Sequence, residues 1–234
     1  MPDRHDCKLT VHFCAEEWLL SVCDSANKPV STKQFPAYLP LLSEEDIVRI
    51  IAKEPEMQKK YASTRFIYES DQYSFVPAIL FRENETSDML YFQHEKDKIA
   101  TVHFNLLENW KMVNLFSVPQ ALNNALLHFY PNPAITHHLT YCLTNLVKRP
   151  SNNKVHIWLR GRKMDVVAVK NGDVELINTY DYQTSEDFLY YLLHIFEQLS
   201  LDIENCKVQL HNAEQKKELV ALAGKYFKCE KPKF

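Results

Sequence analysis

Glycine is the residue that this sequence most lacks. Its 234 residues include only Gly161, Gly172 and Gly224, whereas average usage of about 7% would give roughly 16 glycines. Glycine supplies backbone with positive φ and lets the main chain approach a ligand closely. A chain so poor in glycine cannot build several glycine-lined phosphate loops. It also lacks the Walker, G-x-S-x-G and H-E-x-x-H motifs, so P-loop and common hydrolase sites are excluded.

Basic charge and long apolar runs are missing as well. The formal net charge is −3, which gives no field suited to nucleic acid. No stretch approaches the roughly 20 apolar residues of a membrane span, and no apolar run of a secretion signal follows the N-terminal charges. We therefore expect a cytoplasmic protein without a nucleic-acid partner and without a membrane span.

Cysteine spacing gives no metal or disulfide framework. Six cysteines are present, and no two of them have a C-x-x-C spacing. We expect buried or half-buried free thiols, because free cysteine behaves as a small apolar residue. No residue is assigned as a metal ligand from this pattern.

A unit of three strands and a capped helix is clearest in the second half of the chain. Asn171-Gly172 is the strongest hairpin signal, because a type I′ turn needs positive φ at both central residues. Thr184 followed by Asp187 predicts a helix N-terminus. The expected strands are 154–159, 166–169, 174–180 and 207–210, with helices from 184 to about 199 and over 213–227.

A weaker copy of this unit opens the chain. Strands are expected at 8–14, 18–23 and 29–35, and Ser43 followed by acidic residues predicts the N-terminus of a helix. The same order of turns, strands and cap indicates an internal duplication. Residues 66–68, 75–81, 89–92 and 98–104 are expected to form further strands or half-buried segments. Strands are also expected at 113–118 and 134–138, and helices at 119–129 and 140–146.

The polar stretch from Lys148 to Asn153 carries a proline and predicts a domain boundary. We therefore expect one domain over 1–149, with extra strands, and a smaller one over 150–234. Three antiparallel strands, a helix and a parallel strand resemble a ribonuclease H-like unit. The predicted fold class is α/β, with two tandem ribonuclease H-like units in an actin-like ATPase arrangement.

Two stretches, NGDVELINTYDYQTSEDFLYYLL and SVPQALNNALLHFYPNPAITHH, resemble an uncharacterised Bacteroidetes family of unknown function with the actin-like ATPase fold. The resemblance covers nearly the whole chain and assigns no reaction. It implies that nucleotide, if bound, would meet the turn between the first two strands of each half, and a third loop at the nucleoside.

These three loops are poorly suited to nucleotide. Cys14-Ala15-Glu16-Glu17 has no glycine and places two carboxylates where polyphosphate would lie. The second turn, Arg160-Gly161-Arg162-Lys163, keeps one glycine among three cations, so it is either a residual anion-binding turn or an exposed basic turn. Leu210 to Ala213, the expected nucleoside loop, has no glycine.

Adjacent histidines, His137 and His138, end a predicted strand, where open α/β sheets place ligands. Neighbours on a strand point to opposite faces, so we expect one buried, hydrogen-bonded ring and one exposed ring rather than a metal pair.

The function favoured by the sequence is a non-catalytic actin-like protein that binds an unidentified protein partner and uses no cofactor. The alternative is a nucleotide- or phosphate-binding ATPase or switch with degenerate loops, which alone would need ATP and magnesium. In that case Arg160, Gly161, Arg162 and Lys163 would hold the anion, and no catalytic residue is assigned.

Overall fold

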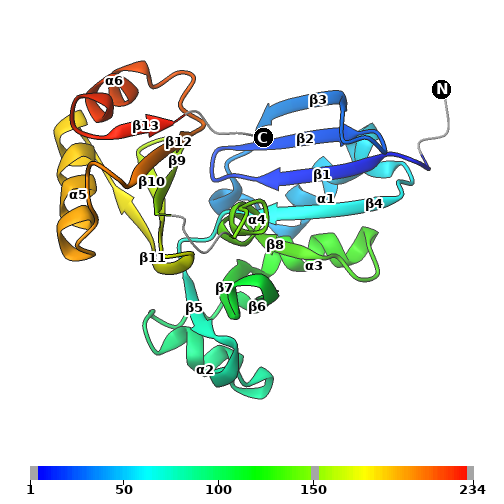
Figure 1. The fold of residues 1–234 in the computed structure, drawn as a ribbon. Coiled ribbons are helices and arrows are strands. Elements are labelled where there is room, and N and C mark those ends of the chain that lie inside the picture. Colours follow the sequence, from blue (N-terminus) through cyan, green and yellow to red (C-terminus); the bar gives the residue numbers. More distant parts are fainter. Residues whose placement is uncertain (1–4, 149–152, 231–234) are drawn as a thin grey trace. The chain divides into compact units, whose positions relative to one another are not determined.

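A computed structural model describes residues 5–148 and 153–230 (Figure 1). The chain divides into two compact units, unit 1 up to Asn145 and unit 2 from Leu146 onward. The boundary predicted after residue 149 lies outside the described residues. Within the described residues, no helix is both long and apolar enough to cross a membrane.

Unit 1 is built on a five-stranded sheet with the order β3-β2-β1-β4-β8. Strands β1 to β3 are antiparallel neighbours, whereas β4 is parallel to β1 and β8 is parallel to β4. The elements of this part are β1 (Lys8–Phe13), β2 (Glu17–Cys23), β3 (Pro29–Pro36), α1 (Glu44–Lys53), β4 (Ser63–Tyr68), α3 (Gln120–Phe129), β8 (Ile135–His137) and α4 (His138–Thr144), with 3-10 turns at Leu39–Leu41 and Pro55–Gln58.

Buried and half-buried side chains alternate along β1, and this alternation shows which face of the sheet packs against the core. Leu9, Val11 and Phe13 are fully buried and pack with apolar residues of α1 and α3, whereas Thr10 and His12 point to the other face. The edge of the Phe13 ring meets Trp18 of β2, with 4.7 Å between ring centroids. The two helices therefore cover the apolar face, and the polar positions of β1 stay on the opposite face.

The predicted start of α1 is confirmed. The Ser43 hydroxyl accepts a hydrogen bond from the Asp46 N–H, and the Asp46 carboxylate accepts one from the Ser43 N–H. This reciprocal pair satisfies two backbone donors that a helix N-terminus leaves open. Ile47 and Ile51 then fall on the buried face of the helix.

Between β4 and α3 the chain forms a second, three-stranded antiparallel sheet with the order β5-β7-β6. Leu90, on the helix α2 of this insertion, packs on Val113 and Leu115 of the central strand, β7. The elements are β5 (Tyr73–Pro77), α2 (Thr86–Tyr91), β6 (Ala100–Leu107) and β7 (Met112–Pro119), with 3-10 turns at Ala78–Leu80, Glu83–Glu85 and Glu108–Trp110.

For two stretches of this insertion, the strand alternative is wrong. Residues 89–92 belong to α2 and the turn after it, and the strand expected over 75–81 ends at Pro77 in a 3-10 turn. The run Met89-Leu90-Tyr91-Phe92 is too short for its periodicity to separate a strand from a helix. Thr86 and Asp88, at the start of α2, suit the first turn of a helix.

Unit 2 repeats the sheet of unit 1 (Figure 1), with the order β11-β10-β9-β12-β13. Its first three strands are antiparallel, and β12 and β13 are parallel to β9. The elements are β9 (Lys154–Arg160), β10 (Lys163–Lys170), β11 (Asp173–Asp181), α5 (Ser185–Gln198), β12 (Lys207–His211), α6 (Lys217–Tyr226) and β13 (Lys228–Glu230).

Local signals in unit 2 are confirmed where they were strongest. Asn171 and Gly172 both have positive φ, as a type I′ turn requires. Thr184 caps α5 and shares a reciprocal hydrogen-bond pair with Asp187. Helix α6 begins at Lys217, four residues later than predicted, and β13 was not predicted.

Candidate functional site

The predicted anion-binding turn joins β9 to β10 in unit 2. Gly161 has a φ of +53°, which L side chains adopt only with strain. Its carbonyl accepts hydrogen bonds from the Tyr182 hydroxyl at 3.0 Å and from Lys216 Nζ at 3.1 Å. The carbonyl of the turn is therefore held by two donors of the same unit.

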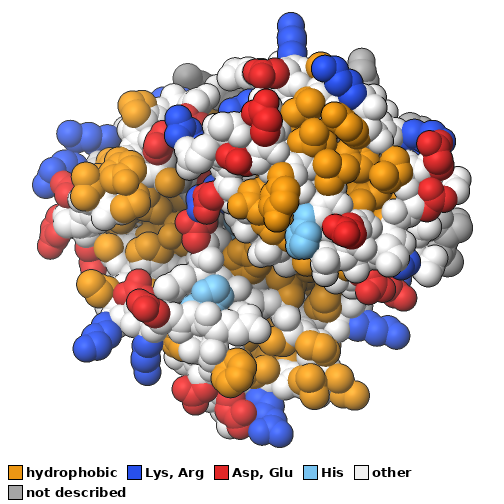
Figure 2. All heavy atoms as spheres, turned by 90° about the vertical axis from the view of Figure 1, so that its left-hand side faces the viewer, with side chains coloured by type: hydrophobic (Ala, Val, Ile, Leu, Met, Phe, Trp, Pro, Cys, Tyr) orange, Lys and Arg blue, Asp and Glu red, His pale blue; other side chains and the backbone are white. Residues whose placement is uncertain are grey.

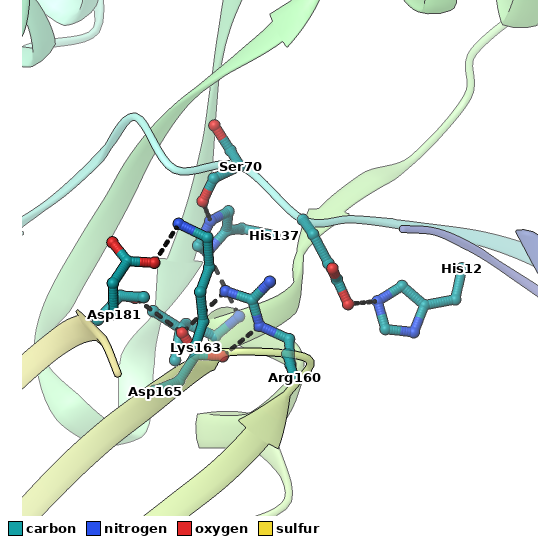
Figure 3. A network of polar contacts seen from close by, with 10 residues as sticks. His12, Ser70, His137, Arg160, Lys163, Asp165 and Asp181 are labelled. Atoms are coloured by element: carbon teal, nitrogen blue, oxygen red, sulfur yellow. Dashed lines mark hydrogen bonds and ion pairs between the residues drawn. The ribbon is translucent and has the colours of Figure 1, made fainter. Parts of the chain in front are cut away.

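Arg160 is committed to a buried carboxylate. Its guanidinium donates to both oxygens of Asp165, with Nη2 to Oδ1 at 2.9 Å (Figure 3). The Asp165 side chain is fully buried, and the Thr179 hydroxyl donates to it at 2.7 Å. A buried carboxylate is stable only when it is paired and hydrogen-bonded, so Arg160 neutralises Asp165 within the sheet.

The other two cations of the turn also have partners in unit 2. Lys163 Nζ lies 3.1 Å from Asp181 (Figure 3), and an Arg162 Nη1 hydrogen donates to Gln183 at 2.7 Å. Both of these contacts involve exposed side chains, so they exchange with water more easily than the Arg160–Asp165 pair. An anion at this turn would compete with these contacts, and its binding stays a prediction.

The corresponding turn of unit 1 follows β1. Its main-chain carbonyls are used internally, because Ala15 O accepts from Leu39 N and Glu16 O accepts from Ala37 N, both at 3.0 Å. Cys14 N donates to Glu17 O at 3.0 Å. No residue of this turn has positive φ. The turn thus closes as a tight hairpin and presents the two glutamates that the sequence places there.

The third predicted loop follows β12. Asn212 has a φ of +56°, a conformation that asparagine tolerates better than most residues. Asn212 therefore adopts the left-handed backbone conformation that glycine adopts most easily. Unlike glycine, it carries a side chain at this position.

A cluster of unlike donor groups in unit 1 was not predicted. His12 Nε2 lies 3.2 Å from a Glu69 carboxylate oxygen, a contact that Figure 3 draws as a dashed line at the labelled His12 ring. The donor atoms of His12, Cys14 and Glu69 all lie within 4.8 Å of one another, and all three side chains are half-buried. We refer to these residues as the His12–Cys14–Glu69 cluster.

The histidine pair at the junction of β8 and α4 differs from the prediction. Both His137 and His138 are buried, so the expectation of one exposed ring is wrong. His138 is the first residue of α4, where the strand alternation that the prediction used no longer applies.

His137 acts as a structural residue. Its Nδ1 accepts from Leu139 N, which caps α4, and its Nε2 lies 3.0 Å from the Ser70 carbonyl (Figure 3). A carbonyl only accepts, so the proton is on Nε2 and the ring is neutral. The His137 ring also packs against the aromatic rings of Tyr73 and Phe116.

Two further histidines are buried in unit 2. His156 Nδ1 and His211 Nε2 are 3.4 Å apart, and Trp158 stacks on His211 with 4.5 Å between ring centroids. Burial, with a smaller effect of the His211 charge, lowers the pKa of His156 to about 3, and burial lowers the pKa of His211 to about 4. Both rings are therefore neutral at pH 7 and pack as flat, half-polar groups.

Comparison with solved structures identifies the fold. A protein of unknown function with an actin-like ATPase fold from Bacteroides thetaiotaomicron is similar over 99% of this chain and 94% of its own, with a TM-score of 0.85 and 18% identity. The inorganic polyphosphate/ATP-glucomannokinase of Arthrobacter sp. strain KM is similar over 96% and 91% of the two chains, with a TM-score of 0.51 and 10% identity.

A structure of the PilM–PilN type IV pilus biogenesis complex is similar over 99% of this chain and 89% of that one, with a TM-score of 0.50 and 10% identity. No curated protein matches the chain. Residues 2–229 match the family described as proteins of unknown function, DUF3822. The chain has the actin-like ATPase fold, and it belongs to the DUF3822 family.

Proposed function

We propose that this protein is a non-catalytic member of the actin-like fold that acts by binding a protein partner. The observation that carries the proposal is a group of large apolar side chains left in solvent on the insertion of unit 1. Ile79 is 92% exposed, and Leu80 and Leu106 are 63% and 59% exposed. Such side chains, when grouped, are typical of interaction surfaces.

Three of the exposed apolar residues, Ile79, Leu80 and Leu106, lie at one end of the three-stranded sheet. Met112 pairs with Pro77 on one side and with Leu107 on the other. The 3-10 turn with Ile79 and Leu80 directly follows Pro77, and Leu106 directly precedes Leu107. We call Ile79, Leu80 and Leu106 the apolar end; each of them is more than half exposed.

The surface around the apolar end suits a protein rather than a small ligand. Charged residues flank the apolar end in the chain, because Arg82 and Glu83 come shortly after the turn with Ile79 and Leu80. Figure 2 shows apolar side chains between acidic and basic ones at the foot of the view. An apolar centre with a charged rim is the usual anatomy of a protein–protein interface. The partner would supply an apolar segment, and a few of these side chains would carry most of its binding energy.

Two other observations support a protein without nucleotide chemistry. The turn of unit 1 presents glutamates, and Arg160 of the unit 2 turn is paired with buried Asp165. PilM–PilN is a complex between proteins in which a chain of similar fold takes part, and this likeness supports partner binding only as analogy of fold.

The second candidate function is nucleotide or phosphate binding with altered loops. It is favoured by the positive φ of Gly161 and by the cations of the Arg160–Lys163 turn. In this case an anion would displace Asp181 from Lys163 and Gln183 from Arg162, both exposed contacts.

A site-specific photo-cross-linker in living cells tests the partner proposal. It is placed at Leu80 and Leu106 of the apolar end, and at Tyr190 on α5 as the control, because Tyr190 and Leu80 are equally exposed at 63%. We expect one protein to be cross-linked from both apolar-end positions and not from Tyr190. The double variant Ile79→Asp/Leu80→Asp should weaken its purified complex at least about tenfold.

Cross-links that are the same from Tyr190 and from the apolar end would contradict the proposal. So would a second copy of this chain as the only product, because that outcome makes the apolar end a self-association surface. Tyr190→Asp serves as the matched charge control and should leave the affinity unchanged.

A further inference from the structure

Strands β1 and β4 of unit 1 bring together three side chains of the types that bind metals, at the C-terminal ends of the two strands. In the parallel pairing of β1 with β4, His12 is opposite Ile67 and Phe13 is opposite Tyr68. The ladder continues for one more step, because Glu69 N donates to Phe13 O at 3.2 Å. Cys14 and Glu69 are therefore neighbours directly after the two strands.

All three side chains share one face of the sheet. Side chains alternate along a strand, so His12 and Cys14, two residues apart, point the same way. Ile67 and Glu69 continue that face on the neighbouring strand. The opposite face holds the apolar core with Phe13 and Phe66, so the donors lie on the face away from the core.

The donor atoms have the spacing of a metal site. A tetrahedral zinc ion with ordinary bond lengths holds nitrogen, sulfur and oxygen donors about 3.4 to 3.6 Å apart. In the structure, His12 Nε2 and Glu69 Oε1 are 3.2 Å apart, and all three donors lie within 4.8 Å.

The orientation of His12 also favours a shared cation. Its Nε2 is closed to solvent and makes no hydrogen bond among the described residues, although the carboxylate oxygen is only 3.2 Å away. The two atoms thus lie side by side without the alignment of a donor and an acceptor. A metal ion satisfies both lone pairs at once, whereas a proton requires that alignment.

We infer that the His12–Cys14–Glu69 cluster binds one zinc ion. Imidazole, thiolate and carboxylate are the three ligand types that zinc accepts, whereas magnesium and calcium prefer oxygen ligands. Three protein ligands leave the fourth position of the tetrahedron to water or to an incoming group.

Unit 2 provides an internal control. Lys8 pairs with Ser63 in unit 1 as Lys154 pairs with Lys207 in unit 2. Counting along both pairs of strands, His12 corresponds to Trp158, Cys14 to Arg160 and Glu69 to Ala213. The corresponding strand ends of unit 2 have no thiolate, carboxylate or imidazole at these three positions, so the fold alone does not create the cluster.

The test is a zinc titration of the full chain after chelator treatment, in competition with a chromogenic chelator. We expect one zinc ion per chain in the wild type. Cys14→Ser and His12→Gln should each weaken binding by at least about 100-fold, since even outer partners of a zinc site contribute 10- to 100-fold. Cys23→Ser, a half-buried cysteine that ends β2, should leave the affinity unchanged.

Cobalt provides a second readout that needs no variant. Wild-type protein loaded with Co²⁺ should show a thiolate charge-transfer band in the near ultraviolet, and its binding should release protons, because the thiol must lose its proton. No zinc binding at micromolar concentration, equal weakening by Cys23→Ser, or a cobalt spectrum without a thiolate band would each overturn the inference.

Discussion

Units 1 and 2 form sheets of the same strand order, but they place opposite chemistry at the end of the first strand. In unit 1, this position carries half-buried metal-binding groups, Cys14 and the neighbouring Glu69. In unit 2, it carries Arg160, which is bonded to fully buried Asp165. The repeated sheet is thus built in both units on apolar alternation and a capped helix, whereas the polar residues at the end of the first strand differ.

The difference also separates two kinds of polar group. The Arg160–Asp165 pair is a closed ion pair, in the sense that the two opposite charges lie next to each other within the sheet. The Thr179 hydroxyl donates a further hydrogen bond to Asp165. In the His12–Cys14–Glu69 cluster, His12 Nε2 is closed to solvent and makes no hydrogen bond among the described residues. We expect the Arg160–Asp165 pair to matter for stability and the His12–Cys14–Glu69 cluster for ligand binding.

The largest effect is expected for Asp165→Asn. This change leaves the Arg160 guanidinium largely buried without its counter-charge, which typically costs about 3 to 5 kcal/mol of unfolding free energy. Urea unfolding measures the loss. Asp181→Asn, which removes the exposed partner of Lys163, should cost less than about 1 kcal/mol.

The paired variant Arg160→Met/Asp165→Leu sharpens this test. It replaces both charges with apolar side chains of similar size and should recover most of the loss. A single variant Asp165→Asn that unfolds like the wild type would show that the pair is not the closed structural element described above.

Acid should destabilise unit 2 through His156 and His211. Their folded pKa values of about 3 and about 4 lie below the ordinary 6.5, so below pH 6.5 the unfolded chain binds protons that the folded chain does not. Stability is therefore complete above pH 6.5 and falls toward pH 4. Between pH 7 and pH 5 the loss is about 2 kcal/mol for each histidine.

Urea unfolding at several pH values measures this loss. The double variant His156→Gln/His211→Gln should have a flatter dependence on pH than the wild type. Equal slopes would mean that other groups cause the acid sensitivity.

The two helix caps should behave alike, although they belong to different units. Ser43→Ala and Thr184→Ala each remove a side chain that accepts from the third N–H of its helix, and each should cost about 1 kcal/mol. Ser43→Thr and Thr184→Ser keep the hydroxyl and should cost little. Thermal and urea unfolding of the four variants compare the units, and losses that differ by more than about twofold would show that the caps are not equivalent.

A loss no larger than that of the caps is expected at Gly161. An added Cβ would meet no atom within 4 Å, so only the left-handed backbone opposes substitution. Gly161→Ala should cost about 1 kcal/mol, whereas Gly161→Asn should cost less, because asparagine tolerates positive φ. A much larger loss for both variants would indicate a close neighbour at the turn.

Local sequence signals predicted most of the fold, because they depend on adjacent residues. Asn171-Gly172, Ser43 with Asp46, and Thr184 with Asp187 each specify a turn or a cap through contacts within four residues. The wrong strand at 89–92 has no such signal, and its short apolar run fits both a strand and a helix.

The polar sites were harder to predict, because their partners are distant in sequence. His12 and Cys14 lie on one strand face, which the alternation of β1 indicates, but Glu69 joins them only through the pairing of β1 with β4. Asp165 was overlooked within an apolar strand, although an acid five residues after Arg160 is a signal for a hairpin ion pair.

The absence of a working nucleotide site is the central proposal for this actin-like protein. Thermal unfolding of the pure protein with ATP or ADP and magnesium, and with pyrophosphate as the control anion, tests it directly. A ligand at 100 times its Kd adds about 2.7 kcal/mol of stability. We expect no shift with any of these ligands. A saturable shift with ATP that Arg162→Gln abolishes would contradict it and make the Arg160–Lys163 turn a phosphate site.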